Sequence, residues 1–356
     1  MADRRREVQE IRERIARLDA ELTERLDARA RLSHEIRALS EAEPVADGGE
    51  AEWLQRIVAS STGDMPAESL RAVFREIRAA GRAIEQPARV AIVGPEGGFC
   101  HQSALEAFGA TTQTVESASA AEALSEVVRS RTAFAVIPFE SSSEGFSQPS
   151  LMALAETDLV LVGERYALAT YHLMSLASDK AQIEKVYMTA AAHAACQRFL
   201  DSELPRASII DVRSPRVAAE LAKEAPSAAA VVPERAGRAV SLEVVRPNVG
   251  DAAEARNRYG IVGLRPAPRS GHDISCLLFS TDDQPGSLYD TLRHFAERGI
   301  NLRKLQSLPA HRDGFEYIFY VEINGHASDR AVVTAIEAIK RSVGYFRLLG
   351  SFPTAS

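Results

Sequence analysis

Residues 89–108 read RVAIVGPEGGFCHQSALEAF, and this stretch decides how the middle of the chain folds. A β-branched run, Arg89–Val93, is followed by the small-residue turn Gly94–Gly98 and then by a helical pattern over His101–Phe108. A strand that ends in a small turn and feeds a helix is one half of a β-α-β unit, so the stretch predicts an α/β domain. Free backbone N–H groups at the start of such a helix favour a bound anion.

The same alternation continues to about Arg265 and predicts one α/β domain over 87–265. We expect strands at Arg89–Val93, Phe134–Phe139, Leu159–Val162, Lys185–Met188, Ala207–Val212 and Ala228–Val232. We expect helices at His101–Phe108, Ala120–Arg129, Phe146–Glu156, Ala192–Leu200, Pro215–Lys223 and Pro233–Ala239.

The N-terminal segment, 1–86, is predicted to be all-α. Apolar residues from Ile11 to Leu39 recur mostly at spacings of three and four, which is the pattern of one long helix with a single apolar stripe. Shorter helical patterns follow at Trp53–Ser60 and Ala67–Glu85. So little chain cannot cover such a stripe, and we therefore expect a homodimer.

A proline-containing linker, Arg265–Gly271, introduces the C-terminal segment, 272–356. Its pattern reads β-α-β-β-α-β, which is that of a ferredoxin-like α+β domain. Three domains suit a chain of 356 residues. The sequence thus predicts a multidomain protein with an all-α, an α/β and an α+β part.

Composition excludes several classes of function. A net charge of −7 does not favour a nucleic-acid partner. No apolar stretch reaches the length of a membrane span, and the N-terminus lacks the apolar core of a signal peptide. Cys100, Cys196 and Cys276 are far apart, which suits reduced thiols rather than disulfides or a zinc site. We expect a soluble, cytoplasmic protein without metal or cofactor.

Three turns of the middle domain are small and polar: Gly94–Gly98, Glu140–Gly145 and Arg213–Pro215. Each leads into a predicted helix, so three such turns facing one cleft would hold a small carboxylate-bearing ligand. Each turn by itself is equally well explained as an ordinary capped helix start. The glycine-rich turn lacks the Gly-Lys-Ser/Thr of a phosphate-binding loop, which argues against nucleotide binding.

Several segments together resemble one family. Gly94–Phe99 looks like the Gly-Pro-Glu-Gly-Thr-Phe opening of prephenate dehydratases, and Pro138–Gly145 resembles their Pro-x-Glu-Asn-Ser-x-Glu-Gly segment. Asn257-Arg258-Tyr259 falls where they carry Thr-Arg-Phe. Gly286-Ser287-Leu288 and Arg298–Leu302 are similar to the ACT domain of this family, and the N-terminal helices resemble its fused chorismate mutase. The order resembles that of the bifunctional P-protein of phenylalanine biosynthesis.

The resemblance implies a helical chorismate-mutase-like domain, a bilobal, periplasmic-binding-protein-like prephenate dehydratase domain and a ferredoxin-like ACT domain that binds phenylalanine as an effector. The positions that it implies for dehydratase catalysis are Glu140, Ser141, Ser142, Asn257 and Arg258. Those implied for substrate binding are Glu96, Gly97, Gly98, Glu144, Thr189, Ala191 and Ser214. Those implied for effector binding are Gly286, Ser287, Leu288, Asn301 and Gln306.

Several of these positions depart from the family pattern. Asn257 replaces the threonine whose hydroxyl assists departure of the substrate's ring hydroxyl while carbon dioxide leaves, and an amide proton is far too weakly acidic for a general acid. Ser141 replaces an asparagine, Gly98 a threonine, and Met188–Ala191 stands for Ser-His-x-Gln. The retained residues are Glu140, Ser142, Glu144 and Arg258, of which Arg258 is suited to bind a carboxylate bidentately.

The mutase segment also departs. Arg12 and Arg29 match two family cations, but they lie about 25 Å apart along a helix, so one site needs Arg12 from a second copy. The family lysine falls at Ser40, and the next family arginine falls at or near Gly49, beside Glu50. Losing such contacts removes charge stabilisation of the breaking ether bond.

Three hypotheses follow. The first interpretation is a catalytically degenerate paralogue that binds a small carboxylate ligand or a partner, because polar site residues are replaced while the apolar periodicity is intact. The second is an active chorismate mutase/prephenate dehydratase with atypical site residues. The third is altered prephenate chemistry, such as non-aromatising decarboxylation, although that group resembles the middle domain alone.

Overall fold

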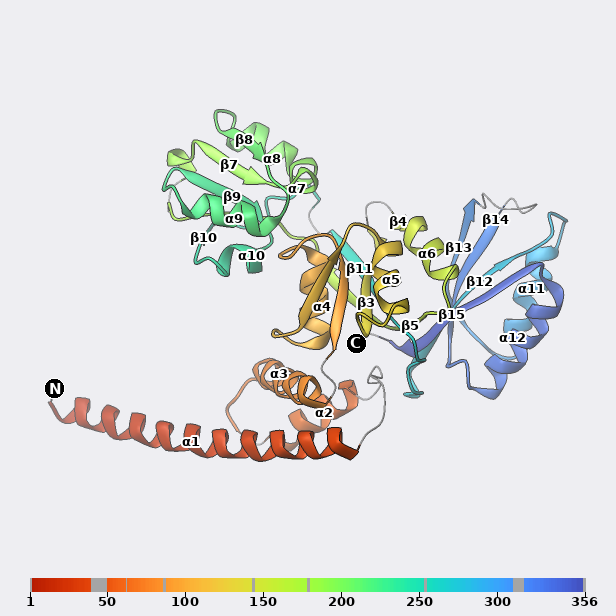
Figure 1. Cartoon of the computed structure of the whole chain (residues 1–356), viewed down its shortest axis with the longest axis horizontal. Helices are drawn as coiled ribbons and strands as arrows, with labels where there is room; N and C mark the ends of the chain where they lie inside the picture. The colour runs from red at the N-terminus through yellow and green to blue at the C-terminus, as the bar shows by residue number, and fades with distance from the viewer. Residues whose placement is uncertain are drawn as a thin grey trace. The chain divides into compact units, whose positions relative to one another are not determined.

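The computed structural model describes residues 2–39, 50–61, 63–85, 88–142, 145–177, 180–252, 255–309 and 317–354 (Figure 1). The chain forms two compact units. The first unit is helical and includes Glu50–Ala88 and the short segment Phe108–Thr112, while the second includes Arg89–Ala107 and Gln113–Ser356. The domain boundaries expected at 86/87 and at 265–272 stay predictions. None of the described helices is long and apolar enough to cross a bilayer.

The helical unit consists of α1 (Ala2–Leu39), α2 (Glu50–Ser60) and α3 (Ala67–Glu85). Helix α3 packs against both α1 and α2. The Ser33 hydroxyl donates a hydrogen bond to the Glu85 carboxylate at 2.7 Å, and the Trp53 and Phe74 rings meet edge to face. These contacts join α1 and α2 to α3, and the three helices follow one another along the chain as the sequence predicts.

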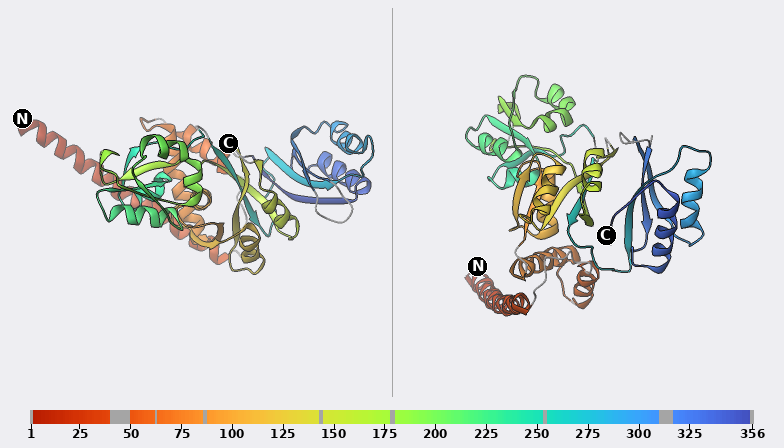
Figure 2. Two further views of the ribbon diagram at one scale, coloured as in Figure 1. Left: turned by 90° about the horizontal axis from the view of Figure 1, so that it is seen from above. Right: turned by 45° about the vertical axis from the view of Figure 1, so that its right-hand side comes forward.

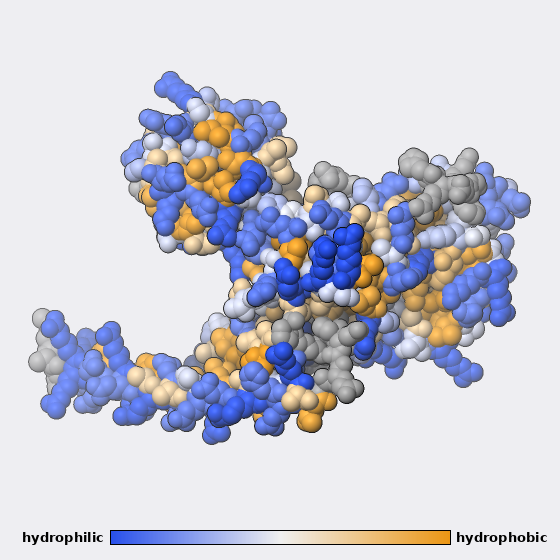
Figure 3. All heavy atoms as spheres, in the orientation of Figure 1, coloured by the Kyte–Doolittle hydropathy of each residue, from blue (hydrophilic) through white to orange (hydrophobic). Residues whose placement is uncertain are grey.

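Most of the apolar stripe of α1 is open to solvent. Leu22 is 60 % exposed, although a core leucine would be almost fully buried. Figure 3 shows apolar residues interspersed with hydrophilic ones along this helix. The other exposed members of the stripe are Ile11, Ile15, Leu18, Leu26, Leu32, Ile36 and Leu39, and Val8 of the same helix is also exposed.

The middle region has two lobes, and their strands belong to two separate sheets (Figure 2). The first lobe orders its strands β2-β1-β3-β11-β5, where β1 is parallel to β2 and β3, and β11 runs antiparallel to β3 and β5. Its elements are β1 (Arg89–Val93), α4 (Phe99–Phe108), β2 (Gln113–Ser117), α5 (Ala120–Val128), β3 (Phe134–Ser141), β4 (Gly145–Phe146), α6 (Gln148–Ala155), β5 (Val160–Leu168) and β11 (Arg256–Gly263).

The second lobe orders its strands β10-β6-β9-β7-β8. The chain enters this lobe after β5 and leaves it before β11, and the two crossing segments touch because the Ala169 N–H donates to the Ala255 carbonyl at 2.6 Å. Its elements are β6 (His172–Ser175), the 3₁₀ turn Lys180–Gln182, β7 (Lys185–Met188), α7 (Ala190–Ala195), α8 (Gln197–Glu203), β8 (Ser208–Asp211), α9 (Pro215–Lys223), β9 (Ala228–Val232), α10 (Glu234–Arg238) and β10 (Glu243–Arg246).

The C-terminal region is a four-stranded antiparallel sheet, ordered β13-β14-β12-β15, with two helices packed against it. Buried side chains such as Phe279, Phe295 and Ile339 form its core. Its elements are β12 (Asp273–Ser280), α11 (Ser287–Ala296), β13 (Leu302–Pro309), β14 (Tyr317–Asn324), α12 (Arg330–Ser342) and β15 (Tyr345–Pro353). This is the split β-α-β arrangement that the sequence predicts.

Strand β15 also pairs with β5 of the first lobe, so both sheets continue into one another. The pairing joins Gly350 to Leu161, and a Cβ at Gly350 would collide with the Leu161 backbone. Only glycine allows so close an approach of two backbones.

The predicted fold class is confirmed in all three parts. Two details are corrected. The helix expected at Ala192–Leu200 is two helices, α7 and α8, separated at Cys196. Strands β2, β4, β6, β10 and β11 were not expected, because none has a clear run of alternating apolar and polar residues, and Phe146 lies in β4 instead of in the helix expected at Phe146–Glu156.

Candidate functional site

The turn after β1 presents backbone groups toward α4. Gly97 has a φ of +82°, which favours glycine, and its N–H donates to Nδ1 of His101 at 3.0 Å. The Glu96 N–H donates to the Glu116 carboxylate at 2.6 Å. Burial lowers the pKa of His101 below its ordinary value of 6.5, although Glu96 acts in the opposite direction. His101 is therefore neutral at pH 7 and accepts the Gly97 hydrogen bond.

This turn meets the second lobe. Oε2 of Glu96 lies 2.6 Å from Nη1 of Arg216, and Gly97 lies against Pro215 and the N–H of Arg216. The Phe99 ring meets the Tyr171 ring at 5.1 Å. Of the residues predicted to bind substrate, the structure thus brings Glu96 and Gly97 next to the start of α9, which Ser214 caps.

The two predicted hydroxyl residues of the second lobe cap helices. Ser214 accepts the N–H of Val217 and Thr189 accepts the N–H of Ala192, both at 3.2 Å. Ala191 lies exposed in the first turn of α7. Capping is thus an observed task of Ser214 and Thr189, and their contact with a ligand stays a prediction.

Strand β11 brings the predicted catalytic residues of the first lobe together. Asn257 lies in register with Ser141 on β3, and its amide donates to the Tyr259 hydroxyl at 3.3 Å. Ser142 donates its N–H to the Arg256 carbonyl and accepts the Arg256 N–H with Oγ at 3.0 Å. Asn257, Ser141 and Ser142 therefore occupy paired or adjacent backbone positions at the end of β3, and we call these three residues the polar group. Glu144 lies outside the described residues.

Arg258 is 3 % exposed and bonds to carboxylates of the chain itself. Its Nε donates to Oε2 of Glu164 at 2.7 Å, its Nη1 bonds to Glu322, and Glu140 lies 3.7 Å away. Burial alone would lower the pKa of Arg258, but the surrounding Tyr320, Glu164 and Glu322 raise it far above its usual value. The guanidinium is permanently charged, and its expected pairing with a ligand stays a prediction.

In the helical unit, two arginines that the sequence did not single out, Arg78 and Arg82, lie near Arg29. Arg29 donates from Nη1 to the Ile77 carbonyl at 3.0 Å and lies against Gly81 of α3. Arg78 stacks over the Trp53 ring at 4.8 Å. Burial first, and then Arg82 and Arg29, lower the pKa of Arg78 to about 10. Arg29, Arg78 and Arg82 thus form a cationic group on one face of α3, which we call the arginine triad.

The other mutase-like positions are less informative. Arg12 lies on an exposed part of α1, far along the helix from Arg29. Ser40, Gly49 and the side chain of Glu50 lie outside the described residues.

The expected effector turn leads into α11, and its residue Gly286 adopts the left-handed backbone conformation. Gly286 has a φ of +93° and its carbonyl accepts the Asp290 N–H at 2.9 Å, so Ser287 and Leu288 begin α11. Gln306 is exposed on β13 and donates to the Ser307 carbonyl. The Asn301 carbonyl accepts the Asn324 N–H at 3.0 Å. The turn is built as expected, and its ligand stays a prediction.

Comparison with known proteins covers the three parts separately and together. Residues 11–86 match the family model of chorismate mutase type II, 90–267 that of prephenate dehydratase and 277–341 that of the ACT domain. The bifunctional chorismate mutase/prephenate dehydratase of Aquifex aeolicus is 32 % identical over 98 % of both chains. The chain belongs to the bifunctional chorismate mutase/prephenate dehydratase family.

Other members and structures agree with this. The bifunctional enzyme of Pseudomonas aeruginosa is 30 % identical over 97 % of both chains. The prephenate dehydratase of Arthrobacter aurescens in complex with L-Phe is 27 % identical, with a TM-score of 0.63 over 74 % of this chain and 90 % of that one. A quorum-quenching acylase, GqqA, shares the fold at 24 % identity, with a TM-score of 0.64 over 75 % of this chain and 98 % of that one.

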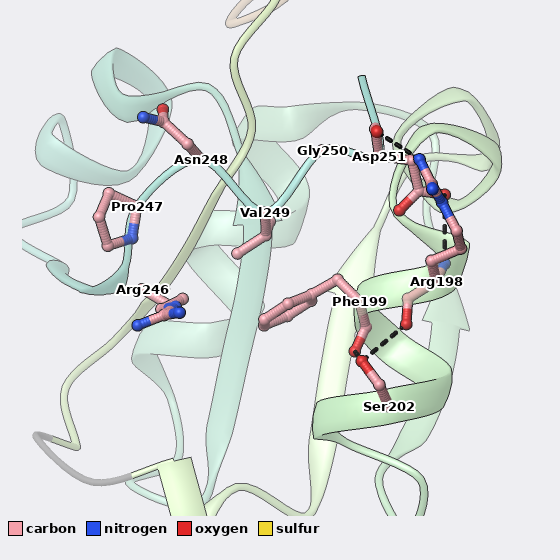
Figure 4. A pocket seen from close by; sticks show the side chains of 9 residues that line it. All are labelled: Arg198, Phe199, Ser202, Arg246, Pro247, Asn248, Val249, Gly250 and Asp251. Carbon is pink, nitrogen blue, oxygen red and sulfur yellow. Dashed lines mark hydrogen bonds and ion pairs between the residues drawn. The ribbon is translucent and has the colours of Figure 1, made fainter. Parts of the chain in front are cut away.

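A pocket of about 540 Å³ lies in the second lobe, and none of the residues predicted for catalysis or binding lines it (Figure 4). Phe199 of α8 points toward Val249, and Arg198 is held by Asp251 through its backbone N–H at 3.1 Å. The remaining lining residues are Ser202, Arg246, Pro247, Asn248 and Gly250. Its two arginines lie in no motif, so the sequence alone gave no signal for it.

Proposed function

We propose that the chain is an active bifunctional enzyme that converts chorismate to prephenate in the helical unit and prephenate to phenylpyruvate in the dehydratase domain. The observation that carries the proposal is the similarity to the bifunctional enzymes across 97–98 % of the chain. A paralogue free of either activity has no need to retain all three parts in order. The site residues are atypical, and other side chains take over their tasks.

In the dehydratase domain we assign the hydroxyl task to Ser142. Its Oγ already accepts the Arg256 N–H, and an accepted hydrogen bond polarises the hydroxyl and strengthens it as a donor. Asn257, which pairs with the neighbouring Ser141, donates a second hydrogen bond to the departing ring hydroxyl. As carbon dioxide leaves, the C4–O bond breaks and the hydroxyl departs as water, with a proton that solvent supplies through the Ser142 hydroxyl while Asn257 only donates a hydrogen bond.

In the helical unit we assign the two substrate carboxylates and the ether oxygen to the arginine triad, with Arg12 supplied by a second copy. Chorismate rearranges without a covalent intermediate, so the site has to fix the conformer and stabilise the charge on the breaking ether bond. Arg78 and Arg82 lie beside Arg29 and replace the charge absent at Ser40. The homodimer that this requires is part of the proposal.

In the ACT domain we propose a phenylalanine site at the Gly286 turn, which offers backbone N–H groups to a carboxylate. The relative from Arthrobacter aurescens was crystallised with L-Phe. We place the whole enzyme in the cytoplasm.

The test measures both reactions on the purified full chain at neutral pH. Loss of chorismate and formation of prephenate report the first activity, and phenylpyruvate, read by its absorbance in alkali, reports the second. Chromatography of the product separates phenylpyruvate from a non-aromatised decarboxylation product. Turnover of neither substrate above the uncatalysed rate would overturn the proposal.

A second candidate function, ligand binding without turnover, is favoured by Asn257 in place of a hydroxyl residue. Titration calorimetry with prephenate, chorismate and phenylalanine separates the two candidates. Binding of prephenate without product would establish the second.

A further inference from the structure

A buried ionic cluster joins the ACT domain to strand β11 of the dehydratase domain. Arg258 lies between Glu164 of β5 and Glu322 of β14, and both carboxylates are less than 7 % exposed. The Tyr320 hydroxyl donates to the same Glu322 oxygen at 2.7 Å. One carboxylate oxygen of Glu322 is thus shared by Tyr320 of its own strand and by Arg258 of the dehydratase domain.

A second contact of the ACT domain reaches the turn that faces β11. Lys304 of β13 bonds to Glu140, and its ammonium group lies 4.7 Å above the Phe146 ring. The Tyr320 ring packs on Phe146 at 4.6 Å. Glu140 and Phe146 are paired residues of β3 and β4, so Lys304 and Tyr320 touch both sides of the hairpin that carries Ser141 and Ser142.

These two contacts bear directly on the polar group of the site. Asn257 is the chain neighbour of Arg258, and Ser141 is the chain neighbour of Glu140. In a strand, consecutive side chains point to opposite faces, so anchoring Arg258 and Glu140 on one face fixes where Asn257 and Ser141 point on the other. A guanidinium that is held by three carboxylates has little capacity left for a ligand.

We propose that Glu322 and Lys304 of the ACT domain are positioning residues of the dehydratase site, and that Arg258 is their anchor instead of the residue that binds the substrate carboxylate. The inference rests on the proposed function, because it assigns a task within the site where prephenate reacts. The ACT domain thereby completes the site in the absence of any effector.

The first experiment measures amide hydrogen exchange of the full chain by mass spectrometry, which does not depend on turnover. In Glu322→Gln, exchange of the peptides covering β11 and residues 139–142 is expected to rise about tenfold or more, while β7 and β9 of the second lobe stay unchanged. The matched control is Glu337→Gln, an exposed carboxylate of α12 that bonds to Lys340. Unchanged exchange in β11, or an equal rise throughout the chain, would overturn the proposal.

The second experiment measures prephenate turnover without phenylalanine. A misplacement of about 1 Å costs on the order of 10²-fold in rate, so Glu322→Gln and Lys304→Met should lower kcat by about that factor and change KM less than about threefold. Lys304→Arg keeps the cation and should restore most of kcat. Lys304 is one-third exposed, so we expect its variants to fold even if Glu322→Gln does not.

The outcomes separate this inference from the proposed function. If the unmodified chain lacks turnover, the proposed function fails, and the exchange experiment still decides whether Glu322 holds β11. If turnover is present and the variants lose binding with kcat retained, Arg258 contacts the substrate and the positioning role is wrong.

Discussion

Ser142 is the residue on which the proposed dehydratase chemistry depends most. Replacing it by alanine removes the donor beside Asn257, and we expect kcat for prephenate to fall about 10²-fold with the unfolding midpoint nearly unchanged. Ser142→Thr keeps the hydroxyl and should retain most activity, while Ser202→Ala in α8 serves as a distant control. Full activity in Ser142→Ala would assign the hydroxyl task to another residue.

Replacing Arg78 is expected to weaken chorismate binding without lowering the stability of the fold. Its pKa of about 10 reflects burial and repulsion from Arg82 and Arg29, so Arg78→Met relieves the fold of a like charge. The same change removes a cation from the arginine triad and should raise KM for chorismate about tenfold. Arg71→Met, an exposed arginine paired with Glu68, is the control. A lower melting temperature with unchanged KM would make Arg78 structural.

His101 makes the turn after β1 sensitive to acid. Its pKa in the fold lies below the ordinary value of 6.5, so its contribution to stability is complete above about pH 6.5 and is lost as the pH falls. Protonation of Nδ1 breaks the bond from the Gly97 N–H. Amide exchange at 94–99, corrected for intrinsic rates, should be faster at pH 5.5 than at pH 7.5. In His101→Gln the difference should disappear.

The exposed stripe of α1 is the element that most needs a partner. Burying Leu22 in a homodimer contributes about 2 kcal/mol per copy, so Leu22→Glu should raise the dimer dissociation constant on the order of 10³-fold. Thr23→Glu adds the same charge beside the stripe and should leave the dimer intact. Analytical ultracentrifugation at micromolar concentration distinguishes these outcomes. If the unmodified chain is a monomer at this concentration, the predicted homodimer is wrong.

The elements also differ in how well they can be predicted from the sequence. The stripe of α1 and the strand β1 depend on neighbours within a few residues, so their periodicity predicts them correctly. Strand β11 lacks that periodicity, because Gly260 has to pass close to Leu161 and Arg258 is turned inward. Its position between β3 and β5 is set by the fold of the whole lobe.

The contacts of Arg258 could not be predicted from the sequence either. Glu164 and Glu322 are distant from it along the chain and belong to no motif, so the sequence offered Arg258 as a ligand-binding cation and gave no sign of its internal partners. The turns at Gly94–Gly98 and Gly286 were found because small residues mark them directly.

At the scale of the second unit, the joint between β5 and β15 is the feature to test. Gly350→Val places a side chain against the Leu161 backbone, and we expect a loss of unfolding free energy on the order of 3 kcal/mol together with faster exchange along β5 and β15. Gly63→Val makes the same change where nothing lies within 4 Å and should be neutral. Calorimetry that shows equal melting temperatures would mean that the joint carries little stability.

The contact between Ala169 and Ala255 has a consequence for how members of this family can be recombined. The second lobe starts and finishes at the same point in space, so it is a single insertion in the first-lobe sheet. A lobe taken from another family member could replace it with both splice points kept, because neither end would have to move. The lobe would thus be exchanged as one unit, while Asn257, Ser142 and Arg258 stayed in the first lobe.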